Sequence, residues 1–138
     1  MHYSKIYVTF CDLNRLKILL DSVKITGSGS EGVVNLLKNK LKRAEVVSPE
    51  SIPEDVVTMN STPEFRNLET GQLMVYTIVY PKDADITERK ISILTPIASS
   101  VFGHGCGECV LADTPSGPLR LMIEHIRYQP EAFGIYIS

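Results

Sequence analysis

The stretch Ile91-Ser92-Ile93-Leu94-Thr95-Pro96-Ile97-Ala98-Ser99-Ser100-Val101-Phe102-Gly103 decides the fold, because a strand-like run passes there into a short helix without a linker. Thr95 can accept a hydrogen bond from backbone N–H groups at the helix start. Pro96 suits the first helical position, since a proline has no N–H to leave unpaired. Gly103 can end the helix in a left-handed conformation. Strand-like runs lie on both sides, so we predict an α+β domain whose short helix packs across a mostly antiparallel sheet.

The flanking sequence contains the strands of that sheet. Runs rich in β-branched and aromatic residues, bounded by turn residues, predict strands at 56–60, 65–68 and 73–80. After the short helix, runs at 109–112 and 119–126 flank the turn sequence Thr114-Pro115-Ser116-Gly117-Pro118 and predict a hairpin. The sheet therefore needs about five strands.

The first third of the chain indicates a short strand followed by two helices. A run at 6–10 predicts the strand, and Asp12 is expected to cap a helix over 13–23 with one apolar face. After a Gly/Ser turn at 26–30, helical spacing of apolar residues predicts a second helix that ends before Pro49. The two helices predict an antiparallel hairpin of coiled-coil type. It either packs on the rest of the protein or projects from it toward a partner.

Composition indicates one compact domain, or one domain carrying a small extension, since 43% of the 138 residues are apolar. Residues 48–55, with two prolines, form the one convincing linker, so we expect a helical hairpin at 1–47 and a second domain at 48–138. The formal net charge of −2 gives no reason to expect sequence-specific DNA or a membrane as partner. No run is long enough for a membrane span, and the odd cysteine count fits a reducing compartment. We expect a cytoplasmic protein.

Several segments after residue 48 form a recognisable set. They are Val57-Thr58-Met59-Asn60-Ser61, Phe65-Arg66-Asn67-Leu68, the 91–103 stretch, Thr114-Pro115-Ser116-Gly117 and Tyr128-Gln129-Pro130-Glu131-Ala132. Together they resemble the bacterial Gre-factor superfamily, and most closely its branch named regulator of nucleoside diphosphate kinase. Over residues 1–47 only the helix–turn–helix plan is similar. The resemblance implies an FKBP-like domain at 48–138 that docks at the rim of the secondary channel of core RNA polymerase, with the hairpin directed toward the channel.

The same resemblance implies that Leu94, Thr95, Pro96 and Ile97 form the surface that binds the polymerase. Cleavage-stimulating members of the superfamily have an acidic residue where this sequence has Leu94, so we expect apolar packing here in place of a salt bridge. An exposed Leu94 or Ile97 on a capped junction would lose little entropy on binding.

Gre factors that stimulate transcript cleavage place two carboxylates together at the hairpin tip, because a second Mg²⁺ needs oxygen ligands. Here Asp21 and Glu31 flank the tip at opposite helix ends, where such residues usually act as caps or solvated charges. We therefore expect a non-enzymatic transcription regulator that has no cofactor and does not stimulate cleavage. The alternative is an Mg²⁺-dependent cleavage factor. Fold alone carries no function, so an FKBP-like domain does not imply prolyl isomerase activity.

A further alternative, a redox or metal protein, rests on His104-Gly105-Cys106-Gly107-Glu108-Cys109. His104, Cys106 and Cys109 are candidate ligands, but a structural zinc site usually needs four, and the other cysteine and histidines are isolated. The pair also follows a helix, whereas reactive pairs open one. We expect a turn with incidental cysteines. Likewise, the basic run 38–43 is expected to be a solvated helix face and not a phosphate site.

Overall fold

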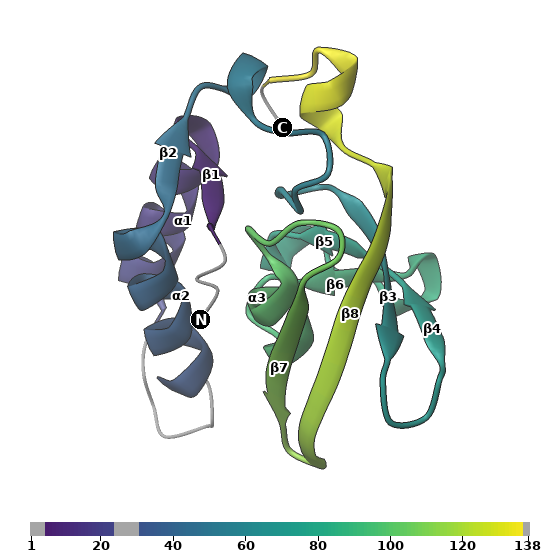
Figure 1. Ribbon diagram of the computed structural model, residues 1–138. Coiled ribbons are helices and arrows are strands. Elements are labelled where there is room, and N and C mark those ends of the chain that lie inside the picture. The colour runs from purple at the N-terminus through teal and green to yellow at the C-terminus, as the bar shows by residue number, and fades with distance from the viewer. Residues whose placement is uncertain (1–4, 24–30, 137–138) are drawn as a thin grey trace.

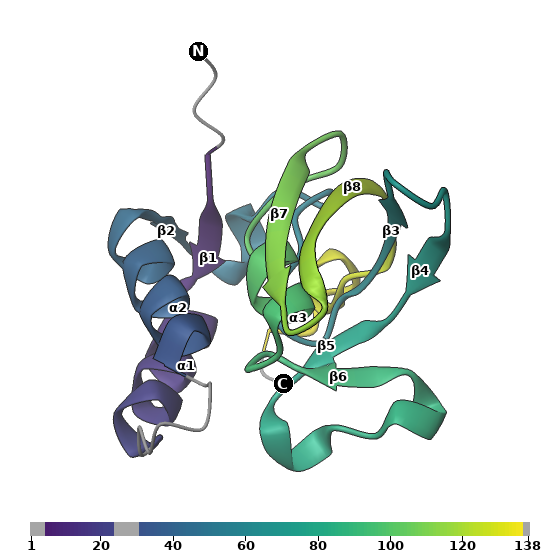
Figure 2. The same ribbon diagram turned by 90° about the horizontal axis from the view of Figure 1, so that it is seen from below.

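The structure is a computed structural model that describes residues 5–23 and 31–136. Helices α1 and α2 lie side by side with β1 and β2, and the other strands and α3 form the rest of the molecule (Figures 1 and 2). The strands are β1 Tyr7–Thr9, β2 Glu45–Val47, β3 Thr62–Asn67, β4 Leu73–Val75, β5 Thr77–Val79, β6 Lys90–Ser92, β7 Cys109–Thr114 and β8 Gly117–Tyr128. The helices are α1 Phe10–Ser22, α2 Glu31–Arg43 and α3 Pro96–Val101, with 3-10 turns η1 Pro49–Ser51, η2 Pro81–Asp83, η3 Ile86–Glu88 and η4 Pro130–Phe133. Over the described ranges, no helix is long and apolar enough to cross a membrane.

The main sheet has four antiparallel strands in the order β4-β3-β8-β7, which confirms the α+β class. The predicted hairpin is also confirmed, because β7 pairs with β8 and Thr114 lies opposite Gly117. Two parallel pairs, β1-β2 and β5-β6, lie outside the main sheet. The prediction of one sheet with about five strands is therefore wrong for the part of the chain described.

Two predicted strands differ from the structure. The run 73–80 divides at Tyr76, since β4 pairs antiparallel with β3 whereas β5 pairs parallel with β6. Residues 56–60 form no continuous strand, although four of the five are buried. The backbone of Val57 instead bonds to His104 O and to Gly103 N, each at 2.9 Å. Burial against the core, and not ladder pairing, explains the apolar character of this run.

The junction between β6 and α3 confirms the predicted strand-to-helix transition. The Thr95 side chain accepts from Ala98 N at 3.3 Å, and Pro96 is the first helical residue. Gly103 has φ 85°, and a Cβ there would lie 2.6 Å from Ile6 Cγ2, so both conformation and space require glycine. Helix α3 packs on β7 of the main sheet (Figure 1).

Helix α1 begins earlier than predicted, and Asp12 is not its cap. Thr9 accepts from Asp12 N at 3.1 Å, so Thr9 caps the helix and Asp12 lies inside the first turn. The buried Asp12 carboxylate accepts the N–H of Met59 at 3.1 Å. Asp12 therefore ties α1 to the segment that precedes β3.

Replacing Asp12 with asparagine is expected to change the pH dependence of stability. Burial raises the pKa of Asp12 to about 7, with the charge of Glu131 acting in the same direction and the Met59 N–H and Arg15 opposing it. The native state thus keeps a proton that the unfolded chain releases above about pH 4, so this group lowers the stability as the pH rises to about 7. An asparagine amide oxygen still accepts from Met59 but does not ionise.

We expect Asp12→Asn to match the wild type near pH 4 and to have a free energy of unfolding on the order of 4 kcal/mol higher at pH 8, because a pKa difference of about three units is worth about 1.4 kcal/mol per unit. Urea unfolding of both proteins from pH 4 to 8 measures the difference between their free energies of unfolding. The titration of other groups contributes equally to both proteins and cancels in this difference. Parallel stability profiles would contradict the assigned role of Asp12.

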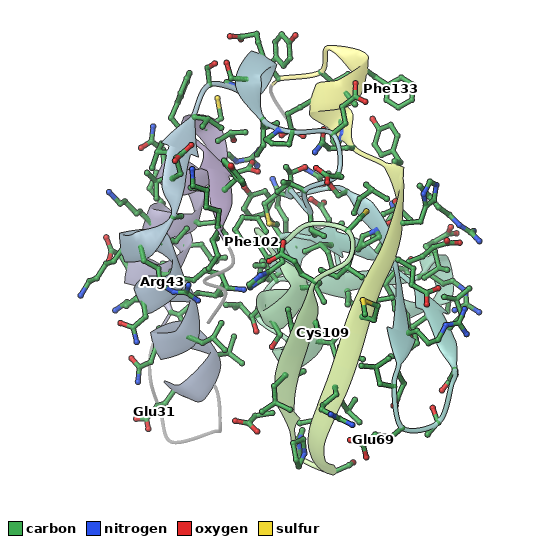
Figure 3. The ribbon with its side chains drawn as sticks, in the orientation of Figure 1. Glu31, Arg43, Glu69, Phe102, Cys109 and Phe133 are labelled. Atoms are coloured by element: carbon green, nitrogen blue, oxygen red, sulfur yellow. The ribbon has the colours of Figure 1, made fainter. Side chains whose placement is uncertain are left out.

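One hydrophobic core joins the helix pair to the sheet. Leu16 and Leu37 from the helices and Phe65, Phe102 and Ile123 from the rest of the protein are fully buried in the same cluster. Figure 3 shows Phe102 between the helix pair and the β7–β8 hairpin. Of the two arrangements weighed for the helices, the structure has the one in which they pack on the rest of the protein. The turn between them lies outside the described residues, and the division into domains at residue 47 stays a prediction.

Lys40 corrects the prediction that the basic run 38–43 is a solvated face. Only 4% of Lys40 is exposed, and its Nζ donates to the carbonyl oxygens of Ser99, Ser100 and Phe102 at 2.8, 3.0 and 2.8 Å. These carbonyls lie at the C-terminal end of α3, where backbone acceptors have no partner within the helix. Lys40 therefore fastens α2 to α3.

Candidate docking site

The predicted docking residues lie at the β6–α3 junction, beside a crevice of about 320 Å³. The crevice is bounded by the first half of α2, by α3 and by the turn between β7 and β8. Pro96 lines it together with Thr114 and Pro115. Two of the segments that carry the family resemblance, 91–103 and 114–117, thus meet at one place.

Side-chain hydrogen bonds hold the backbone of the junction in place. Ser92 Oγ accepts from Leu94 N at 3.0 Å, and Thr95 Oγ1 donates to Ser92 O at 2.8 Å. Ser99 Oγ and Ser100 Oγ donate to the carbonyls of Thr95 and Pro96, at 2.8 and 2.7 Å. A partner that binds here does not need to order the loop first, which keeps the entropic cost of binding low.

The four predicted docking residues are each half-buried, which corrects the expectation of an exposed Leu94 or Ile97. Leu94 and Ile97 pack against the core because their neighbours Ile93 and Ala98 are fully buried. Pro96 is the only one of the four that lines the crevice within the described part of the chain. Part of each of these four side chains is therefore accessible to a partner, on a backbone that is held in place.

The candidate carboxylates at the hairpin tip are both exposed. Asp21 is the residue before the end of α1, and Glu31 is the first residue of α2, at the end labelled in Figure 3. Residues 24–30, between them, lie outside the description. Within the residues described, no group of three or more His, Cys, Asp or Glu side chains is placed to hold a metal ion.

Of the three candidate metal or redox residues, His104 and Cys109 line one cavity and Cys106 lines another. His104 Nδ1 lies 3.2 Å from Glu108 Oε1, and burial lowers the pKa of His104 to about 4, so the ring is neutral at pH 7. Cys106 and Cys109 are free thiols that line separate cavities. Burial raises the pKa of the Cys106 thiol, with the charge of Asp55 acting in the same direction. This environment disfavours the reactive thiolate.

A double variant, Cys106→Ser with Cys109→Ser, is expected to keep the fold and the thermal stability of the wild type. Both residues are replaced by near-isosteric side chains, and the contact of Cys109 Sγ with Met122 Sδ, at 3.9 Å, is a weak one. Thermal unfolding of the variant and the wild type checks the fold. Elemental analysis of the wild type is expected to find less than about a tenth of a zinc ion per chain, because a structural zinc site needs about four ligands. One bound metal per chain would reverse the interpretation.

Reasoning from the sequence missed a polar joint between distant segments. Thr58 Oγ1 donates to Glu131 Oε1 at 2.8 Å, and Gln129 Nε2 donates to the carbonyls of Pro53 and Val56, both at 2.8 Å. Asp12 accepts from Met59 beside this joint. Segments 57–61 and 128–132, both in the recognised set, therefore lie against each other. A threonine within an otherwise apolar run was the one sequence signal of this contact.

The sequence model for the C-terminal region of the transcription elongation factors GreA and GreB matches residues 52–128, which include the β6–α3 junction and the β7–β8 turn. The chain belongs to the GreA/GreB family. The resemblance seen in the sequence is thereby confirmed, and the family makes the protein a regulator of the transcription-elongation-factor type.

Individual members of the family support this assignment. The chain is 35% identical to the regulator of nucleoside diphosphate kinase of Escherichia coli strain K12 over 133 residues, 96% of each sequence. It is also 35% identical to transcription elongation factor GreA of Listeria welshimeri over 106 residues. These residues are 77% of this chain and 66% of the GreA sequence. A solved GreA/GreB transcription elongation factor from Nitrosomonas europaea is 40% identical, with a TM-score of 0.73 over 91% of this chain and all of the other.

Proposed function

We propose that this protein regulates transcription by binding core RNA polymerase at the secondary channel through the β6–α3 junction, without stimulating transcript cleavage. The observation that carries the proposal is the junction itself. Its backbone is held by Ser92 and Thr95, it presents part of Leu94 and Pro96, and it lies inside the region that matches the family. A preordered apolar anchor beside a crevice is a favourable docking element.

The arrangement of the helix pair supports regulation without cleavage. Each helix has 13 residues, which is about 20 Å at 1.5 Å per residue. Asp21 and Glu31 are both exposed and stand ten positions apart in the sequence, on different helices. The sequence between them contains no carboxylate, so neither has a neighbouring acidic residue with which to form a pair of oxygen ligands for Mg²⁺. Lys40 also fastens the pair to α3, so the pair is short and braced. Occupying the channel entrance is the simplest way for such a protein to act.

The proposal is tested by gel filtration with core RNA polymerase, followed by an assay on stalled elongation complexes that hold backtracked RNA. We expect the protein to co-elute with the enzyme, to leave the RNA length unchanged in Mg²⁺, and to slow cleavage by an added Gre cleavage factor through competition. That factor alone is the positive control. Robust Mg²⁺-dependent shortening by this protein would establish the cleavage-factor alternative, and absence of co-elution would overturn the docking proposal.

A further inference from the structure

A second hollow lies along α1 and α2 and shares no lining residue with the crevice at the junction. This groove, called here the helix-pair groove, has a volume of about 510 Å³. Leu13, Leu20, Leu41, Ala44 and Val46 form its apolar part. Val46 is 46% exposed, so apolar surface of β2 faces solvent at one end of the groove.

The charged residues of the helix-pair groove are mostly positive. Lys17, Lys38 and Lys42 line it, with Asp21 as the single acidic residue, and all four are exposed. In a chain whose formal net charge is −2, this is a local excess of positive charge. Across residues 5–23 and 31–136, no ion pair involves any of the three lysines. Their ammonium groups can therefore pair with carboxylates of a partner.

The shape of the groove selects among negatively charged partners. On α1 the lining positions Leu13, Lys17, Leu20 and Asp21 share one face and span about 12 Å, roughly two helical turns. A trough between two packed helices accepts a third helix at an interaxial distance of about 8–10 Å. A flat bilayer does not reach the floor of a trough. A nucleic acid would find leucines where it needs stacking side chains or hydrogen-bond donors.

We propose that the helix-pair groove docks an acidic amphipathic helix of a partner protein. Apolar side chains of that helix lie on Leu13, Ala44 and Val46, the apolar lining residues that are not fully buried, and its carboxylates pair with Lys17, Lys38 and Lys42. Two turns of contact bury a small area, so the affinity is in the micromolar range typical of transient interactions. This site is independent of the polymerase-docking junction.

The test uses the full chain and a fluorescein-labelled peptide of about 14 residues, roughly four helical turns, with leucines on one face and glutamates on the other. Fluorescence polarisation is expected to give a dissociation constant of about 1–50 µM at low salt. Lys38→Glu with Lys42→Glu is expected to weaken binding at least tenfold. The matched control, Lys82→Glu with Lys90→Glu, changes the net charge equally at exposed positions outside the groove and is expected to change binding less than threefold.

Three more measurements distinguish an acidic helix from the rest of the ligands that a basic groove could attract. A peptide with serines in place of its leucines should lose binding, since the floor is apolar. Should the double variant unfold in a thermal melt, Lys17→Glu on α1 serves as the test variant, with the same tenfold expectation. Any of three results would overturn the proposal. They are equal binding by the serine peptide, equal loss in the Lys82/Lys90 control, and no binding of the acidic peptide. Tighter lysine-dependent binding of single-stranded RNA or of anionic vesicles would also overturn it.

Discussion

Replacing Lys40 with methionine is expected to lower the free energy of unfolding by about 2–4 kcal/mol. Three buried carbonyl oxygens, those of Ser99, Ser100 and Phe102, lose their donor, and each buried acceptor left without one costs about 1–3 kcal/mol. Part of that loss is offset, because methionine brings no ammonium group into the interior. The cost of burying that group is visible in the pKa of Lys40, which burial lowers to about 7.

Lys42→Met is the matched control, since Lys42 lies on the same helix but is exposed. It should change the free energy of unfolding by less than about 0.5 kcal/mol. Urea unfolding of the three proteins at pH 7, followed by circular dichroism, gives the comparison. If Lys40→Met is no less stable than Lys42→Met, the three carbonyls have other partners and Lys40 does not fasten α2 to α3.

The same lysine predicts a pH dependence. Its pKa is lower in the native state than in the unfolded chain, where it is 10.5, so the unfolded chain binds more protons between about pH 7 and 10.5. The stability of the wild type should therefore rise relative to that of Lys40→Met across this window.

Leu94→Asp and Pro96→Ala are each expected to weaken binding to core RNA polymerase at least tenfold, which corresponds to ~1.4 kcal/mol. Leu94→Asp places a charge on a surface proposed to bind by apolar packing, and Pro96→Ala removes ring surface beside the crevice. Both effects rest on the proposed docking through the β6–α3 junction. Affinity is measured by competition with a labelled Gre factor for the polymerase.

The stability of these variants must be measured in parallel because both positions are half-buried. Ile86→Asp is the control for Leu94→Asp, since Ile86 is an exposed apolar residue of η3. Pro81→Ala is the control for Pro96→Ala, since Pro81 also opens a helical turn. Binding that falls only in proportion to the folded fraction, or equally in the controls, would place the docking surface elsewhere.

The structural features that the sequence by itself determined depend on interactions between residues that are close together in the chain. The Thr95 cap, the Pro96 helix start and the left-handed Gly103 involve residues within a few positions of one another, and all three are present in the structure. The β7–β8 hairpin follows from a turn between two strand-like runs in the same way. The family could also be recognised, because its motifs are short and contiguous.

Contacts between distant residues decided the rest, and no local pattern predicts them. In the sequence, Lys40 cannot be distinguished from the other lysines on a polar helix face. In the structure, three carbonyls at the end of α3, about 60 positions later, accept hydrogen bonds from it. Asp12 had the spacing of a cap, yet Thr9 takes that role and Asp12 bonds to Met59. The run 73–80 divides because its two halves face different strands. Burial and hydrogen-bond partners are properties of the packed chain, and they alone distinguish a buried ion from a solvated one.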